Sequence, residues 1–505
     1  MSLFQNKKGR TTGLSRVKRM DRRDFLKSSL AFTAPVLLSH CSSVASTAQV
    51  SELDRLWQQA DAIEASIRAV VIPPKVYQAS AHQVQVLPSQ AEAIQAVSLA
   101  RHNRQALQAL IDLCHQQGGG RVLLSAGVWP CGAIRLKSNV ELHLAKDALL
   151  QFVPEPELYL PYVHTRWEGM ELMGYQPLIY AYQATNIAVT GQGRIDGGGS
   201  NQHWWPWKGA WKHTPWQVNP EQEQKNGRDL LMQMTEQGLP VEQRVLTPNF
   251  LRPPLLQTYD CQQVLIEGLT LTNSPFWLIH PVLTQDLTVR NVKCISHGPN
   301  SDGCDPESCQ RVLIEGCEFD TGDDCIALKS GRNADGRRFA TPVQQVLIQD
   351  CVMKAGHGGV VLGSEISGGA QAIFARRLVM SSPDLDRGLR IKTNALRGGE
   401  IDTVALRDIV IGQVKDAIVI NYFYEEGRDG AYLPQVRNLS LHNVEIGQAE
   451  RLFELRGFAE APIGLIQLSK VTARALQLGV LEQVSEIRTQ QVQLNGEAWQ
   501  HNPQS

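Results

Sequence analysis

Hydrophobic and polar positions alternate in a recurring pattern in the second half of the chain. The order is apolar, any, apolar, two of any kind, apolar, any, apolar, and it is first clear at Val264, Ile266, Leu269 and Leu271. The pattern starts again, at intervals of 23 to 35 residues, from Leu287, Val312, Val346, Ile373, Val404 and Leu439. Period-two alternation predicts strands. Each unit is therefore predicted to be a short strand, a turn of Gly, Asn or Asp, and a second short strand.

Repeats of this length are typical of solenoids, in which each unit buries its apolar face only against its neighbours. The strand period excludes a helical solenoid. No Leu-x-x-Leu-x-Leu frame holds, which disfavours leucine-rich repeats, and the hairpin turns of propeller blades are missing. We therefore predict an all-β fold, a single-stranded parallel β-helix, over residues 119–505.

Short helical segments are predicted before the strands. Residues 50–70 place apolar side chains on one helical face, and so do Arg104–Gln117, which a run of glycines at 118–120 ends. Residues 71–88 are extended and punctuated by proline. Residues 49–118 are therefore predicted as a helical and extended segment that caps the β-helix.

One long stretch, residues 200–251, interrupts the strand pattern. It contains five tryptophans, namely Trp204, Trp205, Trp207, Trp211 and Trp216. The stretch is either a loop packed over the solenoid or a wall of the active site, whose rings stack on sugar faces. The density of tryptophan favours the wall.

The first 48 residues have the layout of an export signal. Basic residues lead to Arg22-Arg23-Asp24-Phe25-Leu26-Lys27, followed by an apolar stretch at 30–38 and small residues at 46–48. The Arg-Arg core resembles a twin-arginine signal, and the apolar stretch is too short to span a membrane comfortably. We predict a twin-arginine-type signal over residues 1–48, export by the Tat machinery, and a periplasmic or secreted protein without membrane association after signal removal. His40 before Cys41 fits a lipoprotein site poorly.

Composition narrows the function classes. The 505 residues carry a formal net charge of -1, so no global basic field exists for a large nucleic-acid surface. The ten cysteines include no CxxC pair, which argues against a zinc site. Three of them fall at apolar positions of predicted strands and are expected to be buried small side chains: Cys294, Cys317 and Cys351.

The densest group of potential acids lies between residues 300 and 324. Asp302 and Asp323 are 21 residues apart, about one coil of the solenoid, so they can lie one above the other. The adjacent Asp323 and Asp324 converge only if the chain bends, which Gly322 permits. Neighbouring carboxylates raise the pKa of the least solvated member, and a protonated acid beside ionised carboxylates is what glycosidic cleavage needs. Turn formation and calcium binding are the alternatives for such a cluster.

Two further segments follow at about one coil each. His357 lies between glycines, which suggests a close approach to the backbone. Arg390 and Lys392 alternate along a predicted strand, so both project from one face and can bind a carboxylate.

Four short motifs of the chain resemble, in order and spacing, the motifs of glycoside hydrolase family 28, the polygalacturonase family. They are Asn300-Ser301-Asp302, Gly322-Asp323-Asp324, Gly356-His357-Gly358 and Arg390-Ile391-Lys392. Ser301 replaces the usual Thr of the first motif. The resemblance extends from about Arg121 to Gly457 and includes Thr165-Arg-Trp-Glu-Gly. Two segments, beginning at Lys329 and at Gly363, look most like the bacterial exo-acting branch.

The resemblance implies a right-handed parallel β-helix that hydrolyses its substrate with inversion, without a metal or other cofactor. Asp323 matches the general acid, and Asp302 and Asp324 match the pair that activates water. His357 matches a residue that tunes the acid. Arg390 and Lys392, with Asn300, match substrate-binding residues.

The implied activity is cleavage of α-1,4-galacturonosidic bonds in polygalacturonate or pectic oligosaccharides, from a chain end. Arg390 and Lys392 favour galacturonate in the cleavage subsite, because its carboxylate needs a partner. Three alternatives remain: hydrolysis of a related rhamnogalacturonan, a calcium-dependent pectate lyase, and a non-catalytic carbohydrate-binding solenoid.

Overall fold

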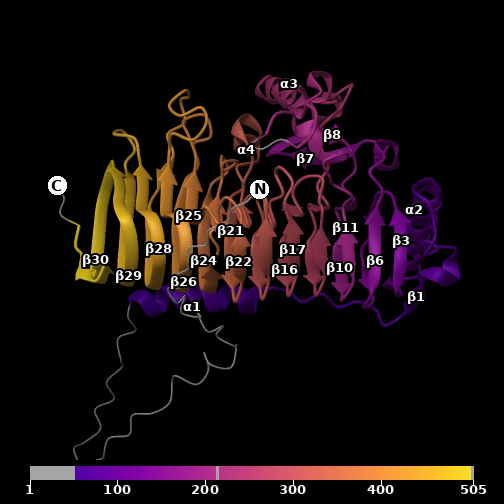
Figure 1. Ribbon diagram of the computed structural model, residues 1–505, viewed down its shortest axis with the longest axis horizontal. Coiled ribbons are helices and arrows are strands. Elements are labelled where there is room, and N and C mark those ends of the chain that lie inside the picture. The colour runs from indigo at the N-terminus through magenta and orange to yellow at the C-terminus, as the bar shows by residue number, and fades with distance from the viewer. Residues whose placement is uncertain (1–51, 212–214, 502–505) are drawn as a thin grey trace, which may run out of the picture. The chain divides into compact units, whose positions relative to one another are not determined.

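Most strands stack in register as successive coils of a right-handed parallel β-helix, which confirms the predicted fold (Figure 1). The computed structural model describes residues 52–211 and 215–501. The predicted repeat starts all lie in one ladder, in which each start pairs with the next: Val264, Leu287, Val312, Val346, Ile373, Val404 and Leu439. The apolar repeat therefore sets the register of the stack.

The coils carry strands on three faces rather than the two predicted from the repeat, and in the C-terminal coils a single long strand, such as β26 (Glu400–Asn421), runs through several faces. The first face consists of β1 (Val76–Gln78), β2 (Gly120–Leu124), β5 (Val140–Leu144), β10 (Thr185–Gly191), β13 (Gln262–Glu267), β16 (Gln285–Arg290), β18 (Gln310–Glu315) and β21 (Val343–Gln349). It continues into β24 (Ala370–Met380), β26 (Glu400–Asn421), β27 (Gln435–Val436), β28 (Asn438–Arg456), β29 (Ile463–Glu482) and β30 (Val484–Leu494). A short β31 (Glu497–Ala498) pairs antiparallel with the end of β30.

The second and third faces are built from shorter strands. The second face consists of β3 (Gly127–Cys131), β6 (Ala148–Phe152), β11 (Arg194–Asp196), β14 (Thr270–Thr272), β17 (Lys293–Ser296), β19 (Glu318–Thr321) and β22 (Val352–Ala355). The third face consists of β4 (Ile134–Leu136), β9 (Ile179–Tyr182), β12 (Leu256–Tyr259), β15 (Ile279–Val282), β20 (Ile326–Leu328), β23 (Val360–Leu362) and β25 (Arg387–Lys392). Third-face strands such as Ile326–Leu328 and Val360–Leu362 are three-residue apolar runs without alternation, so periodicity could not separate them from a turn.

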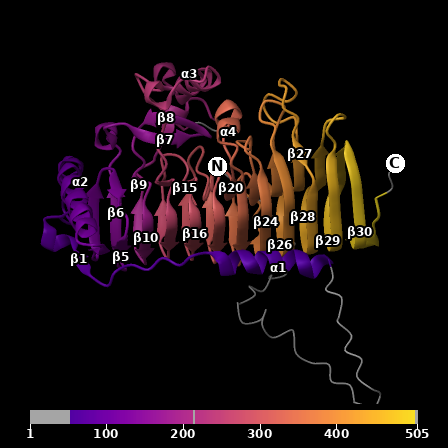
Figure 2. The same ribbon diagram turned by 180° about the vertical axis from the view of Figure 1, so that it is seen from behind.

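Two helices from the N-terminal part of the chain pack on the solenoid at different places. Helix α1 (Glu52–Ser66) lies along the first face, where Trp57 packs edge-on against Phe374 (Figure 2). Helix α2 (Ala93–Gln116) packs against β3 near the end where the coils begin. The prediction that α2 starts at Arg104 was wrong, because a capping box of Glu92 and Gln95 begins the helix earlier. The short 3-10 helix η1 (Ala79–His82) lies between α1 and α2.

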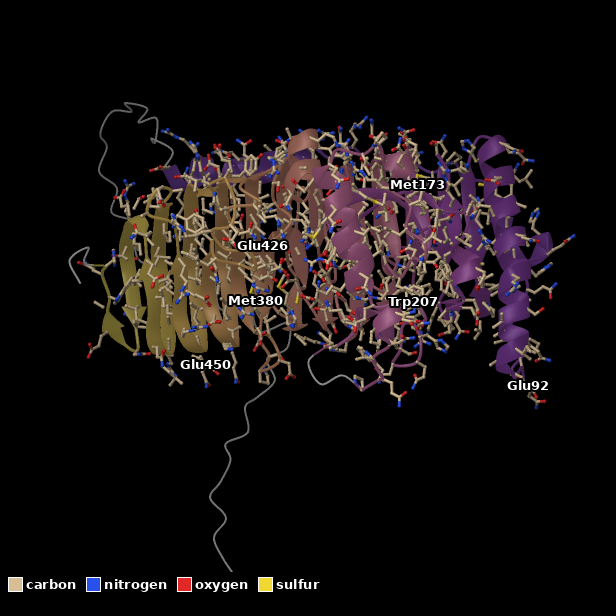
Figure 3. The ribbon with its side chains drawn as sticks, turned by 90° about the horizontal axis from the view of Figure 1, so that it is seen from above. Glu92, Met173, Trp207, Met380, Glu426 and Glu450 are labelled. Atoms are coloured by element: carbon tan, nitrogen blue, oxygen red, sulfur yellow. The ribbon has the colours of Figure 1, made fainter. Side chains whose placement is uncertain are left out.

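The side opposite α1 carries the chain segments that do not belong to the coils. They are η2 (Pro156–Tyr159), the antiparallel hairpin of β7 (Val163–Trp167) and β8 (Met170–Gly174), η3 (Trp205–Lys208), η4 (Pro220–Gln222), α3 (Gln224–Glu236), η5 (Val241–Gln243) and α4 (Asn333–Phe339). Figure 3 looks down on this side, where Met173 of the hairpin and Trp207 of the insert are labelled. The insert 200–251 therefore lies over the solenoid together with the hairpin.

Three tryptophans of the insert have a packing role, which corrects part of the prediction that all five form a binding wall. Trp204 is buried against Tyr159, and Trp207 packs edge-on against it. The indole N–H of Trp205 donates to the carbonyl oxygen of Ser274 at 2.9 Å. These contacts anchor η3 to the coils beneath it.

Two smaller predictions can be compared with the described residues. Every cysteine there, including Cys294, Cys317 and Cys351, is a buried free thiol, as expected for small core side chains. None of the helices in residues 52–211 and 215–501 is long and apolar enough to cross a membrane. The predicted signal at 1–48 lies outside the described residues.

Candidate active site

A cavity of about 390 Å³ opens at the corner between the second and third faces, beneath the hairpin and the insert. Its titratable lining residues include both acids and bases: Glu168, Lys208, Arg228, Asp302, Asp323, Lys329, Arg332, His357, Glu365, Asp386, Arg387, Arg390, Lys392 and Glu425. The remaining lining residues are Trp211, Trp277, Asn300, Ser364 and Tyr424. All of the predicted site residues except Asp324 line this cavity.

The three predicted aspartates converge. One carboxylate oxygen from each of Asp302, Asp323 and Asp324 lies within 4.8 Å of the others. The chain bends at Gly322 and Asp323, between β19 and β20, as the convergence requires. Gly322 approaches the carbonyl oxygen of Gly298 so closely that a Cβ there would lie 2.6 Å from it. A larger residue at position 322 would therefore displace the bend.

The coil register differs in one detail from the prediction. The N–H of Gly303 donates to the carbonyl oxygen of Asp324, so Asp324 rather than Asp323 occupies the position one coil after Asp302. Asp324 is fully buried behind the cavity wall, whereas Asp323 is partly exposed to the cavity. The bend thus pushes Asp323 forward and leaves Asp324 behind it.

His357 lies one coil beyond Asp323, as predicted. Its Nδ1 lies 2.9 Å from Oδ1 of Asp323, and its backbone N–H donates to the carbonyl oxygen of the same residue. Gly356 has a φ of 147°, and a Cβ there would lie 2.5 Å from that carbonyl oxygen. The glycine is therefore needed for the close approach that the Gly-His-Gly pattern suggested.

Arg390 and Lys392 project from one face of β25 and reach the same carboxylate. The Nζ of Lys392 lies 2.7 Å from Oδ2 of Asp324, and Nη1 of Arg390 lies 3.4 Å from Oδ1. Tyr424 lies beneath both cations, with its ring centroid 5.5 Å from the guanidinium carbon of Arg390. The two cations hold Asp324 ionised and still line the cavity.

Asn300 is positioned by a buried guanidinium. Nη2 of Arg252 donates to Oδ1 of Asn300 at 2.7 Å, and Nη1 donates to the carbonyl oxygens of Pro275 and Pro299. Asn300 itself has a φ of 55°. Arg252, which follows the insert, thus fixes the loop that carries Asn300 and Asp302.

Of the three aspartates, Asp302 is the one whose ionised form is least favoured. Burial, together with the charges of Asp305 and Asp323, raises the pKa of Asp302 well above its usual range. Lys329 opposes this rise, since its ammonium lies 3.9 Å from Oδ2 of Asp302. Of the three aspartates, Asp302 is therefore the one on which a proton is most favoured.

Asp323 and Asp324 have the opposite tendency. Burial would raise the pKa of Asp323, but the charges of His357 and Lys392 outweigh it and hold that pKa below its usual range. Lys392 and Arg390 likewise outweigh burial at Asp324 and lower its pKa. The charge of Asp323 raises the pKa of His357. These shifts favour the ionised form of Asp323 and the protonated form of His357.

Sequence reasoning missed the buried lysine at the base of the cavity. The ammonium of Lys329 lies 3.1 Å from Glu365, 3.6 Å from Asp305 and 3.9 Å from Asp302. It follows the apolar strand β20, and a charged residue that continues a buried strand is the signal that could have identified it.

A chain of ion pairs links this lysine to the hairpin, and it was also missed. Arg332 lies 2.5 Å from Glu365 and 3.1 Å from Glu168, in the turn between β7 and β8. Glu168 in turn lies 2.8 Å from Arg228 of α3. Glu168, Arg332 and Glu365 come from segments that carried only the family resemblance, and Arg228 comes from the insert. Nothing in the sequence pairs these residues.

The aspartate cluster is the group that could hold a metal ion within the described chain. Its members already face Arg390, Lys392, Lys329 and His357, which are cationic groups. A divalent ion placed among the three carboxylates would be repelled by these neighbours. The donor set therefore suits an anionic substrate better than a cation.

Comparisons with known proteins point in the same direction. The model of the family described as Glycosyl hydrolases family 28 matches residues 247–450. Among solved structures, the chain is similar to a hyperthermoactive exopolygalacturonase from Thermotoga maritima, with 36% sequence identity, a TM-score of 0.79, and coverage of 87% of this chain and 96% of that one.

Two further similar proteins are more distant. A probable polygalacturonase of Vitis vinifera is 28% identical over 70% of this chain and 67% of that protein. An exo-poly-alpha-D-galacturonosidase of Dickeya chrysanthemi is 25% identical over 64% of this chain, and the match spans 55% of that protein.

Proposed function

The chain belongs to glycosyl hydrolases family 28, and we propose that it hydrolyses α-1,4-galacturonosidic bonds in polygalacturonate and pectic oligosaccharides, acting from a chain end. The observation that carries the proposal is the convergence of three aspartates with Arg390 and Lys392 at one cavity. The Thermotoga maritima and Dickeya chrysanthemi proteins are both named as exo-acting, which supports the chain-end mode.

Arg390 and Lys392 hold the carboxylate of the galacturonate in the cleavage subsite. Both cations line the cavity, and the guanidinium fork matches the two oxygens of a carboxylate. A neutral sugar would leave this pair without a new partner. Galacturonate is therefore favoured over the rhamnose units of a rhamnogalacturonan in this subsite.

Asp323 donates a proton to the glycosidic oxygen, and Asp302 and Asp324 activate the attacking water. Asp323 projects furthest into the cavity, and Asp302 also lines it, while Asp324 lies behind them. His357 holds the Asp323 carboxyl in place through its Nδ1. Direct attack by water in a single displacement inverts the configuration of the anomeric carbon.

Substrate binding reverses which of Asp302 and Asp323 favours the proton. The substrate carboxylate neutralises Arg390 and Lys392, which otherwise help to hold down the pKa of Asp323. The pKa of Asp323 then rises, and the proton held by Asp302 moves to it, since the two carboxyls lie within the same 4.8 Å cluster. Lys329 stabilises the Asp302 carboxylate that remains.

One turnover restores the starting protonation of Asp302 and Asp323. Asp323 passes its proton to the leaving oxygen and becomes a carboxylate beside His357. The water gives one proton to Asp302 as its oxygen bonds to the anomeric carbon. The site therefore returns to the charges of the empty state, with Asp302 protonated and Asp323 ionised.

The hairpin and the insert close one end of the cavity, which favours attack at a chain end. Glu168, at the tip of the hairpin, pairs with both Arg228 and Arg332. The next residue, Gly169, approaches Arg332 so closely that a Cβ would lie 2.6 Å from its backbone nitrogen. A polymer cannot continue past this clamped turn without breaking buried ion pairs.

Early products of polygalacturonate digestion test the proposed mode. Separation of the first products by anion-exchange chromatography should give only galacturonate or digalacturonate. A ladder of intermediate oligomers would mean internal cleavage and would refute the exo assignment while leaving the hydrolase assignment in place.

The same digestion separates hydrolysis from the lyase reaction. A lyase leaves an unsaturated, ultraviolet-absorbing end and needs calcium, whereas hydrolysis leaves neither a double bond nor a chelator-sensitive rate. We expect reducing ends to form at an unchanged rate in EDTA, with no rise in ultraviolet absorbance. Loss of activity in EDTA together with that absorbance would overturn the proposed chemistry.

Export through the Tat machinery remains part of the proposal, with a periplasmic or secreted location. It rests on the Arg22-Arg23 core and the apolar stretch at 30–38. Replacing both arginines by lysine should leave the full-length precursor in the cytoplasm. Unimpaired export of that variant would refute the signal assignment.

A further inference from the structure

The insert places a lysine in the cavity wall. Lys208 lies at the end of η3 and lines the same cavity as Arg390 and Lys392. The half-buried ammonium takes part in no ion pair or side-chain hydrogen bond within the described chain. Burial lowers the pKa of Lys208 despite the charges of Glu168 and Asp323 nearby.

The other cations of the cavity all have carboxylate partners in the chain itself. Arg228 and Arg332 pair with Glu168. Lys329 has three carboxylates within 3.9 Å, and Arg390 and Lys392 share Asp324. Arg387 lies 3.3 Å from Asp386. Lys208 is thus the lining cation, among the described residues, whose partner has to come from outside the chain.

Lys208 is held on a rigid support. Trp205 is hydrogen-bonded to Ser274, and Trp207 packs against Phe250 with ring centroids 5.1 Å apart. The following Gly209 has a φ of 79° and accepts a hydrogen bond from the indole of Trp216. Because this turn is anchored on both sides, the backbone that carries Lys208 is fixed at the cavity wall before any ligand arrives.

An aromatic plate lies beside this cation. Trp211 lines the cavity, and its ring stacks on Trp216 at 6.1 Å with an interplanar angle of 8°. A flat indole presents an apolar surface to the CH groups of a sugar ring, and an ammonium binds the carboxylate on the same sugar. The pair therefore matches the two chemical features of a uronic acid.

We propose that Lys208 and Trp211 form a second uronate subsite, which binds the galacturonate next to the one held by Arg390 and Lys392. The assignment rests on the proposed function, because it takes a galacturonan chain as the ligand. Every sugar of that chain carries a carboxylate, so a neighbouring residue needs its own cation. Lys208 selects substrates with two adjacent acidic sugars and disfavours a methyl-esterified neighbour.

A pair of substrates tests the subsite. Trigalacturonate carries several carboxylates, whereas an aryl α-galacturonide carries one, which Arg390 and Lys392 bind. In Lys208→Met, kcat/KM for trigalacturonate should fall about 10- to 100-fold, as expected for one charge-assisted hydrogen bond. The value for the aryl galacturonide should stay within twofold, and Lys208→Arg should restore most of the loss.

The control is Lys225→Met, which removes an exposed lysine of α3 in the same insert and should change neither substrate. Equal losses on both substrates in Lys208→Met, or no loss on either, would overturn the second subsite while the proposed hydrolysis stands. A wild-type enzyme that cleaves neither trigalacturonate nor polygalacturonate would overturn the proposed function and the subsite with it.

Discussion

Glu171 of β8 ties the hairpin over the active site to the body of the solenoid, and its charge should stabilise the fold in a pH-dependent way. The side chain is buried and lies 2.8 Å from His164 and 2.5 Å from Arg338. It also accepts a hydrogen bond from the hydroxyl of Tyr259. Burial would raise the pKa of Glu171, but these partners and Arg166 lower it from 4.5 to about 2.

The magnitude follows from the difference between the folded and unfolded pKa values. Glu171→Gln keeps the shape of the side chain and removes its charge. A lowered folded pKa gives stability that is fully present above the unfolded pKa and is lost as pH falls through the folded pKa. A difference of about 2.5 pKa units corresponds to about 3 kcal/mol at pH 7, and about 1.4 kcal/mol of it remains at pH 3.

Urea unfolding of the wild type and the variant at several pH values measures this difference. The gap in unfolding free energy should be about 3 kcal/mol at pH 7 and should close between about pH 4.5 and pH 2. Glu236→Gln is the control, because Glu236 is exposed and lies 3.9 Å from Arg337, and its effect should be at most about 1 kcal/mol. An equal gap at pH 7 and pH 3 for Glu171→Gln would refute the electrostatic reasoning and point to lost packing.

Three further outcomes are expected. Asp323→Asn should lower the rate of galacturonate release about 100- to 10,000-fold, while calorimetry should show that oligosaccharide binding is kept. The control Asp320→Asn, at an aspartate that pairs with His297, should change neither the rate nor the binding. Unchanged turnover in Asp323→Asn would favour a non-catalytic binding protein. Lys329→Met should move the alkaline limb of the kcat/KM profile to higher pH, because Lys329 opposes the rise in the pKa of Asp302 and the free enzyme of the variant would keep the Asp302 proton to higher pH, and an unmoved limb would contradict that role. Trp57→Ala should destabilise the protein by about 3–5 kcal/mol in thermal or urea unfolding, since it empties a buried site under α1, and a loss below about 1 kcal/mol would mean that α1 is not needed on the first face.

The stacking of the coils could be predicted from the sequence because it depends on a local, repeated property. The first apolar residue of each repeat, such as Val312, pairs with the first apolar residue of the next repeat, here Val346, so the repeat alone predicts which residues pair. The third strand of each coil could not be predicted in this way. Strands such as Ile326–Leu328 are buried on both sides and contain no alternation that periodicity can detect.

The motif residues were predicted to meet because each lies at the same corner of successive coils. His357 and Asp323 confirm this, since their contact needs only the coil register and the bend at Gly322. The ion pairs of the cavity could not be predicted. Glu168 and Arg332 are far apart in the chain, and they meet only because the hairpin folds back over the coils.

A site of this kind is stable only if its buried charges are compensated in three dimensions. Three carboxylates within 4.8 Å repel one another, and burial increases the cost of each charge. The solenoid compensates by supplying cations from later coils, at Lys329 and at Lys392, to carboxylates that project from earlier ones. Because each coil contributes one or two residues at the same corner, the fold can place opposite charges side by side without a long loop. Among the described residues, Lys208 is the lining cation that this scheme leaves without a partner, and it comes from the insert and not from a coil. Under the proposed second subsite, the insert is therefore where a requirement for the substrate's own charge enters the site.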